Sequence, residues 1–204
     1  MDAESTDRAE LWWLPVGAGG MVVARTSRWW ELLSARHDRR APQQLVHAAL
    51  ELFTDGGRFV IEMTPQWGQP QDASGVVTTG PVGLRALGRF RLFRYEVRAW
   101  PEGTLPDRAY AVAPPTVITL GRTRAHALLD ALPDIPRHTW GRVVPPTGDM
   151  WNSNSLIAWA LCRAGIDAMT LTPPVGCRAP GWAAGVAAGS QQQHTQPTSA
   201  STRS

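Results

Sequence analysis

The chain has 204 residues, and its 20 basic and 17 acidic side chains give a formal net charge of +3. Every basic residue is Arg, so the sequence excludes chemistry that needs a lysine, such as Schiff-base catalysis, a P-loop phosphate site or a Ser–Lys dyad. With 43% hydrophobic residues the chain can bury a core, and its length fits one domain. The net charge is too small to indicate nucleic-acid binding by itself.

Three further features bound the class of protein. No run approaches the roughly 18 apolar residues that a membrane-spanning helix needs. The first ten residues are acidic, unlike a secretory signal. The two cysteines, Cys162 and Cys177, are too few for a disulfide framework and lack metal-site spacing. We therefore expect a cytoplasmic protein with no membrane span, no metal and no cofactor.

In chain order, the polar residues 1–10 are expected to be disordered. The apolar runs 11–16 and 21–25 flank a glycine-rich turn and predict a hairpin. Residues 29–33 are predicted to begin a short helix, and the charged, proline-containing segment 36–44 is predicted to be a loop.

The clearest local pattern is a second hairpin. Residues 45–53 and 58–64 are rich in strand formers, and the sequence Thr-Asp-Gly-Gly at 54–57 between them is a strong turn signal. Pairing Phe53 with Arg58 across this turn sets the register that we expect for the two strands.

Residues 65–80 are predicted to be a loop, and residues 87–100 to be a strand. A β-bulge between Leu92 and Phe93 would bring five charges to one side of that strand. Mixed basic and aromatic residues can track single-stranded nucleic acid, but an acidic residue interrupts this patch, so nucleic acid is not the expected partner. The five charged residues are Arg89, Arg91, Arg94, Glu96 and Arg98.

Two helices are predicted in the C-terminal half. Residues 123–132 carry apolar side chains at helical spacing, and residues 152–164 form a second helix that Asn152 or Ser153 caps and Gly165 ends.

The order of elements predicts an α+β fold with a small antiparallel sheet packed with two or three helices. We expect a single domain over residues 11–182. The low-complexity residues 183–204 are predicted to be a disordered tail.

Chemistry is concentrated in three residues. Ser155 lies in the first turn of the last helix, where free N–H groups can stabilise an oxyanion. His47 on one hairpin strand could act as its base, and Glu62 on the partner strand could orient that His. The expected register places His47 and Glu62 on the same face of the hairpin.

Residues 45–63 and 148–165 resemble the circularly permuted papain-like proteins related to the NlpC/P60 and LRAT group. The resemblance rests on the His47 hairpin and on Asn154-Ser155, which match that family's Asn-Cys helix start. It implies an amidase, peptidase or acyltransferase with Ser155 as nucleophile, His47 as base, Glu62 as orienting acid and Asn154 polarising the carbonyl. The implied substrate is a small molecule or peptide.

One departure from that family bears directly on activity. Its nucleophilic Cys is Ser here, and a hydroxyl ionises far less readily than a thiol. The sequence therefore leaves two functions open: a hydrolase or acyltransferase acting on an amide or ester bond, or a non-catalytic binding or structural module of the same fold.

Overall fold

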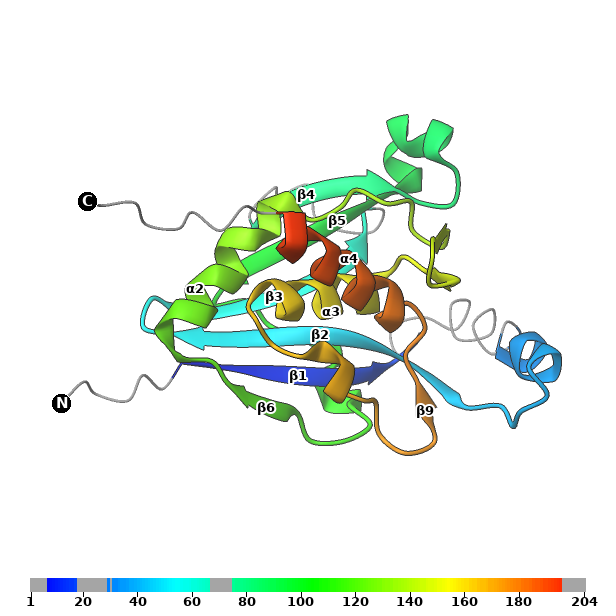
Figure 1. Ribbon diagram of the computed structural model, residues 1–204, viewed down its shortest axis with the longest axis horizontal. Helices are drawn as coiled ribbons and strands as arrows, with labels where there is room; N and C mark the ends of the chain where they lie inside the picture. Colours follow the sequence, from blue (N-terminus) through cyan, green and yellow to red (C-terminus); the bar gives the residue numbers. More distant parts are fainter. Residues whose placement is uncertain (1–6, 18–28, 30, 67–74, 196–204) are drawn as a thin grey trace.

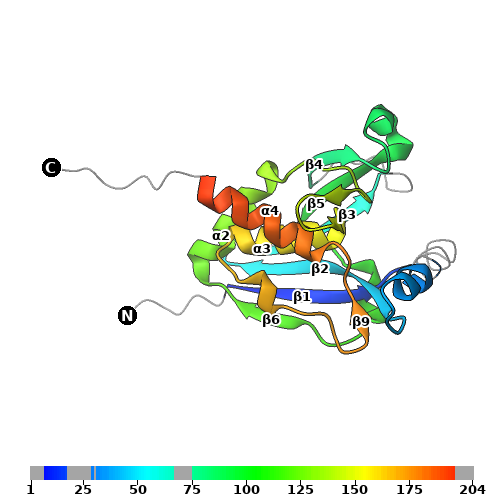
Figure 2. The same ribbon diagram turned by 45° about the vertical axis from the view of Figure 1, so that its right-hand side comes forward.

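The computed structural model describes residues 7–17, 29, 31–66 and 75–195. Within this part of the chain, six strands follow the order β4-β5-β3-β2-β1-β6, and each is antiparallel to its neighbours. Helices α2 and α3 pack on one face of this sheet, and α4 packs on α3 (Figure 1, Figure 2). The predicted α+β fold is therefore confirmed.

The elements have the following bounds. The strands are β1 (Arg8–Pro15), β2 (Gln44–Thr54), β3 (Gly57–Pro65), β4 (Val76–Pro81), β5 (Arg94–Pro101), β6 (Thr116–Thr119) and the parallel partner of β2, β9 (Cys177–Arg178). A separate hairpin consists of β7 (Val143–Val144) and β8 (Asp149–Met150). The α-helices are α2 (Gly121–Ala131), α3 (Ser153–Arg163) and α4 (Trp182–Thr195), and residues 31–37 are also helical. Short 3-10 helices are η1 (Arg85–Arg89), η2 (Arg91–Phe93), η3 (Pro106–Tyr110), η4 (Leu132–Asp134) and η5 (Ala168–Thr170).

The β2–β3 hairpin has the predicted register. Phe53 pairs with Arg58 and Thr54 with Gly57, so the turn signal in the sequence set the pairing. The hydrogen-bonded ladder between these strands ends at Leu50 and Ile61. Beyond that pair, β2 continues without β3 beside it.

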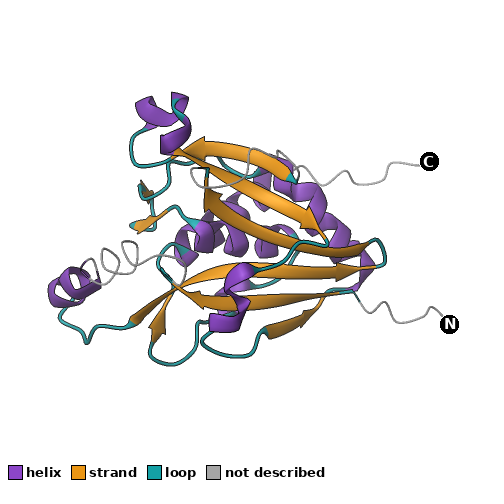
Figure 3. Ribbon diagram, turned by 180° about the vertical axis from the view of Figure 1, so that it is seen from behind, coloured by secondary structure: helices purple, strands orange, loops and turns teal. Residues whose placement is uncertain are grey.

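The two faces of the sheet have different surroundings, because alternate side chains of a strand point to opposite sides. On β2, Ala48 and Leu50 belong to the large core beneath the helices, whereas Ala49 belongs to a small second core. That second core also contains Trp12 and Leu105, and it lies on the side of the sheet that Figure 3 shows in front. We call this second side the polar face, because it also carries His47, Glu51, Glu62, Glu96 and Arg98.

The first strand differs from its prediction. β1 begins at Arg8, inside the segment expected to be disordered, because Ala9, Leu11 and Trp13 alternate into the core. It pairs with β2 on one side and β6 on the other. The predicted partner strand at 21–25 lies outside the described residues.

The region from 65 to 100 also differs. Strand β4 lies in the predicted loop, and the first half of the predicted strand 87–100 is the 3-10 pair η1 and η2. Strand β5 begins only at Arg94, so the predicted bulge at Leu92 is wrong, and the irregular pairing lies in β4 instead. No side chain of η1 or η2 is buried, so this strand-like sequence lacks the core packing that would hold it extended.

The helices of the C-terminal half were predicted in part. Helices α2 and α3 lie where their periodicity placed them, and Asn152 caps α3. The predicted tail is wrong over residues 183–195, which continue α4. Gly185 explains the error. Glycine lowers helix propensity, so the sequence does not look helical here, but a Cβ at this position would overlap main-chain atoms of Ser155. Because glycine has no Cβ, α4 can pack closely on α3.

Near the N-terminus, the predicted loop 36–44 is helical up to residue 37. A buried carboxylate, Glu31, holds this helix to the body through ion pairs with Arg40 and Arg178. None of the helices in the described part of the chain combines the length and apolar character needed to cross a bilayer.

Candidate functional site

The predicted nucleophile, Ser155, lies at the start of α3 as part of a helix cap. The side-chain oxygen of Asn152 accepts hydrogen bonds from the N–H groups of Asn154 and Ser155 at 2.9 and 3.3 Å. In return, the Ser155 hydroxyl accepts the N–H of Asn152 at 3.1 Å. This reciprocal arrangement is a capping box, and it satisfies donors that the first turn of a helix otherwise leaves without partners.

The Ser155 side chain is also closed off from solvent. None of the residue's surface is exposed, and its Oγ lies 2.7 Å from the carbonyl oxygen of Gly181 and 3.1 Å from that of Met150. A hydroxyl has one proton to donate, and here main-chain carbonyls accept it. Ser155 therefore has the surroundings of a structural residue.

The predicted oxyanion residue, Asn154, is likewise buried and fully bonded. Its Oδ1 accepts the N–H of Ala48 at 2.6 Å, and its Nδ2 donates to the carbonyl oxygens of Val46 and Pro180 at 3.1 and 2.7 Å. The pairing of β2 with β3 ends before these β2 residues. Asn154 therefore supplies the hydrogen bonds that β3 no longer makes, and its amide is not free for a ligand.

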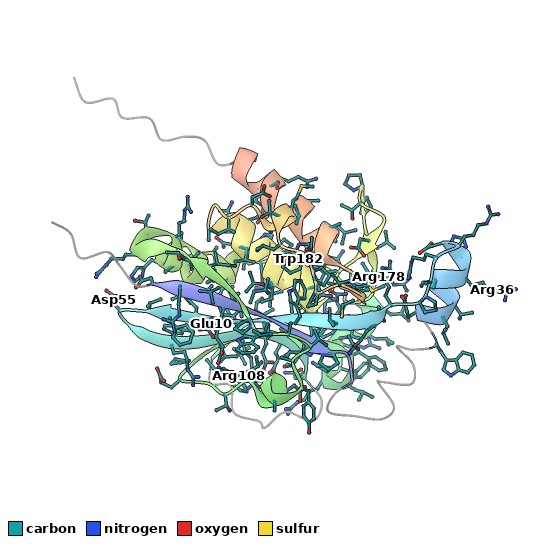
Figure 4. All side chains as sticks on the ribbon, turned by 90° about the horizontal axis from the view of Figure 1, so that it is seen from below. Glu10, Arg36, Asp55, Arg108, Arg178 and Trp182 are labelled. Atoms are coloured by element: carbon teal, nitrogen blue, oxygen red, sulfur yellow. The ribbon has the colours of Figure 1, made fainter. Side chains whose placement is uncertain are left out.

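The structure does not bring His47 and Ser155 together. Val46 and Ala48, on either side of His47, belong to the core under α3. The intervening His47 side chain therefore points to the polar face, away from the start of α3. Figure 4 shows the two sides through labelled residues, with Trp182 of α4 above the sheet and Arg108 of η3 below it.

Replacing Ser155 by alanine is expected to lower the free energy of unfolding by about 1–2 kcal/mol, because Asn152 and Gly181 lose a buried partner. Urea unfolding followed by tryptophan fluorescence measures the change, with Thr123→Ala, exposed on α2, as matched control. A serine-directed fluorophosphonate should leave Ser155 of the folded protein unlabelled. Labelling at Ser155 would contradict the structural role.

The polar face brings His47 and Glu62 to the same side of the sheet, as the register predicts, and adds charges from β5 and η3. In the β3–β5 ladder, Glu62 lies directly opposite Arg98 on the neighbouring strand. Asp107 of η3 is close enough for its charge to act on both His47 and Glu62. This group of His47, Glu62, Arg98 and Asp107 is called the polar cluster below.

Two neighbouring carboxylates on the polar face are neutralised by arginine. Glu51 is 1% exposed, and its oxygens lie 3.3 Å from both the Arg58 and the Arg108 guanidinium groups. Glu96 lies 2.6 Å from the guanidinium of Arg98. Removing either partner of such a buried pair would leave an uncompensated charge inside the protein, which is costly.

Glu62 differs from these carboxylates, because none of the described residues forms a hydrogen bond or ion pair with it. Burial raises its pKa to about 7, the charge of Arg98 opposes that rise, and the charge of Asp107 adds to it. Glu62 is therefore about half ionised near neutral pH.

His47 is neutral in this environment. Burial lowers its pKa below the ordinary 6.5, and the negative charge of Asp107 only partly offsets that effect. The polar cluster thus holds two carboxyl groups without an ion-pair partner among the described residues, on Glu62 and Asp107, beside a neutral imidazole. Its chemistry suits a cation or a hydrogen-bond donor.

Across the residues that the structure describes, no group of three or more His, Cys, Asp and Glu side chains is placed to hold a metal ion.

Sequence reasoning found His47 and Glu62 but not their surroundings. Arg98 and Glu96 were predicted only as charges on one side of a strand, whereas in the fold they are 3% and 5% exposed. Asp107 lies beyond the predicted strand 87–100, and no sequence pattern marked it as part of a site. The alternation Arg-x-Glu-x-Arg over 94–98 was the one available indication that a charged strand face could be paired internally.

Comparisons with known proteins do not extend this picture. No protein-family model, no curated protein and no solved structure matches the chain.

Proposed function

We propose that this protein is a non-catalytic binding module that takes a small organic cation, such as an alkylammonium group, at Glu62 and Asp107. The observation that carries this proposal is the state of Glu62: a largely buried carboxylate with no ion-pair partner among the described residues and a pKa of about 7. Perturbed titratable groups that are not neutralised by the fold are concentrated at functional sites.

The charge balance of the polar face favours a cation over an anion. Arg98 is already engaged by Glu96, and Arg58 by Glu51. The neutral His47 adds no positive charge. An ammonium group would therefore approach a carboxylate that forms no ion pair with a described arginine, although the charge of Arg98 acts on it.

The alternative, hydrolysis through Ser155, has less support. Its hydroxyl is bonded to main-chain carbonyls and lies across the sheet from His47. The proposed relationship to permuted papain-like proteins is a separate matter. It is supported by the hydrogen bonds that join the His47 strand to the start of α3 through Asn154.

Binding of n-butylammonium, followed by NMR of the His47 ring, tests the proposal. A bound cation favours ionised Glu62, so binding should strengthen as pH rises. With a free pKa near 7, the ionised fraction increases from about 9% at pH 6 to about 91% at pH 8, which predicts roughly tenfold tighter binding. The neutral analogue n-butanol should leave the His47 ring signals unchanged.

The matched variants are Glu62→Gln and Asp130→Asn, the latter changing an exposed carboxyl on α2. Glu62→Gln should weaken binding at least tenfold and abolish its pH dependence, because the carboxylate is gone. Asp130→Asn should bind like the wild type. Equal binding at pH 6 and pH 8, or unchanged binding by Glu62→Gln, would refute the proposal.

A further inference from the structure

Three segments gather at one end of the sheet. The turns η1 and η2, the β7–β8 hairpin and the helical residues 31–37 lie at the same end of the molecule in Figures 1 and 3. Figure 4 labels Arg36 at this end and Asp55 at the other. Segments far apart in the sequence therefore lie at the same end of the molecule.

This end carries large apolar side chains that the core does not use. The exposed fraction of each of these side chains lies between 40% and 68%. Leu84, Phe90 and Leu92 lie in or directly beside η1 and η2, and exposed apolar residues gathered in this way on a folded protein indicate a contact surface. We call this set the apolar end, and its members are Trp29, Leu32, Leu33, Leu84, Phe90, Leu92 and Val143.

The apolar end is also positively charged. Arg85, Arg89 and Arg91 are exposed on η1 and η2, and the Arg89 guanidinium lies 4.8 Å from the centre of the Phe90 ring. No Asp or Glu occurs in the sequence from residue 76 to 95. Exposed arginines also accompany the other two segments, so the charge complements an anionic partner.

Two of the described acidic residues near this end, Glu31 and Asp38, are neutralised within the fold. Glu31 is buried in its ion pairs with Arg40 and Arg178, and Asp38 lies 3.3 Å from the Arg40 guanidinium. They do not offset the exposed arginines Arg36 and Arg39.

We propose that the apolar end docks on the surface of an anionic phospholipid membrane. Aliphatic and aromatic side chains such as Leu92, Phe90 and Trp29 enter the boundary between headgroups and acyl chains, while arginines beside them contact anionic headgroups. Nucleic acid is the weaker fit, because most of the exposed apolar side chains are aliphatic and cannot stack on bases as aromatic rings do. The proposal does not depend on the ligand of the polar face.

Vesicle sedimentation of the full chain tests this proposal. Vesicles of phosphatidylcholine with 30% phosphatidylserine should bind the protein, and vesicles of phosphatidylcholine alone should bind it much more weakly. The double variant Arg85→Gln/Arg89→Gln should lose more than tenfold in partitioning, since each basic residue near the surface contributes about fivefold. Leu84→Ser/Leu92→Ser should lose at least tenfold through the apolar term.

The control variants change matched residues elsewhere. Arg122→Gln/Arg124→Gln removes two exposed arginines of α2, and Val117→Ser removes an exposed apolar side chain of β6. Both should bind vesicles like the wild type, and circular dichroism establishes that all variants are folded. Three outcomes would overturn the proposal: no preference for phosphatidylserine, equal losses in the controls, or tighter binding to a single-stranded oligodeoxythymidylate than to the vesicles.

Discussion

Replacing Asn154 by alanine is expected to lower the free energy of unfolding by about 3–5 kcal/mol, the largest effect of any single polar substitution considered for this protein. The side chain makes three buried hydrogen bonds, to Ala48, Val46 and Pro180. Its loss leaves main-chain groups of β2 and of the segment before α4 without partners, and each such group costs about 1–3 kcal/mol.

Urea unfolding, followed by tryptophan fluorescence at constant pH, measures this effect. Thr123→Ala serves again as the control, because an exposed α2 position should change stability by no more than about 0.5 kcal/mol. A loss below about 1 kcal/mol for Asn154→Ala would show that Asn154 is not structural, and it would reopen its predicted role beside a reacting carbonyl.

Replacing Glu62 by glutamine is expected to stabilise the protein at pH 8 by about 2–3 kcal/mol and to change little at pH 4. The pKa of Glu62 is about 7 in the folded protein and near 4.5 in the unfolded chain. Below pH 4.5 the carboxyl is protonated in both states and its titration has no effect. As pH rises from 4.5 through 7 the unfolded chain ionises first, so wild-type stability falls, and above 7 the full penalty remains.

The measurement is the difference in unfolding free energy between Glu62→Gln and the wild type at several pH values. Taking the difference removes the contribution of His47, which is the same in both proteins. Burial lowers the pKa of His47, so this residue reduces stability as pH falls below 6.5, opposite in sign to Glu62. Glu102→Gln, a change at an exposed carboxyl, is the control. Parallel curves for Glu62→Gln and the wild type would contradict the raised pKa of Glu62.

The stability changes of Asn154→Ala and Glu62→Gln together would distinguish predicted site residues that stabilise the fold from those kept for binding. A large loss for Asn154→Ala would assign the start of α3 to stability. A pH-dependent gain for Glu62→Gln would show that the fold bears an energetic cost at the polar cluster, as proteins do where a group is kept for binding. The cation proposed for the polar face would offset part of that cost by pairing with Glu62.

Local signals decided the parts of the fold that could be predicted from the sequence. The turn residues at 54–57 set the β2–β3 register, and Asn152 with Gly165 marked the ends of α3. These features depend on neighbours within a few residues, so a single sequence contains them. The sequence also correctly placed His47 and Glu62 on one face of the hairpin.

Long-range packing decided the rest. α4 forms because Gly185 allows its backbone against Ser155, and an isolated segment rich in glycine and glutamine would not remain helical. The same packing encloses the Ser155 hydroxyl, so a residue placed like a nucleophile became a cap. The burial of alternate side chains across the whole sheet decides which face of β2 meets α3, and only the tertiary structure determines that burial. As a consequence, His47 points away from Ser155.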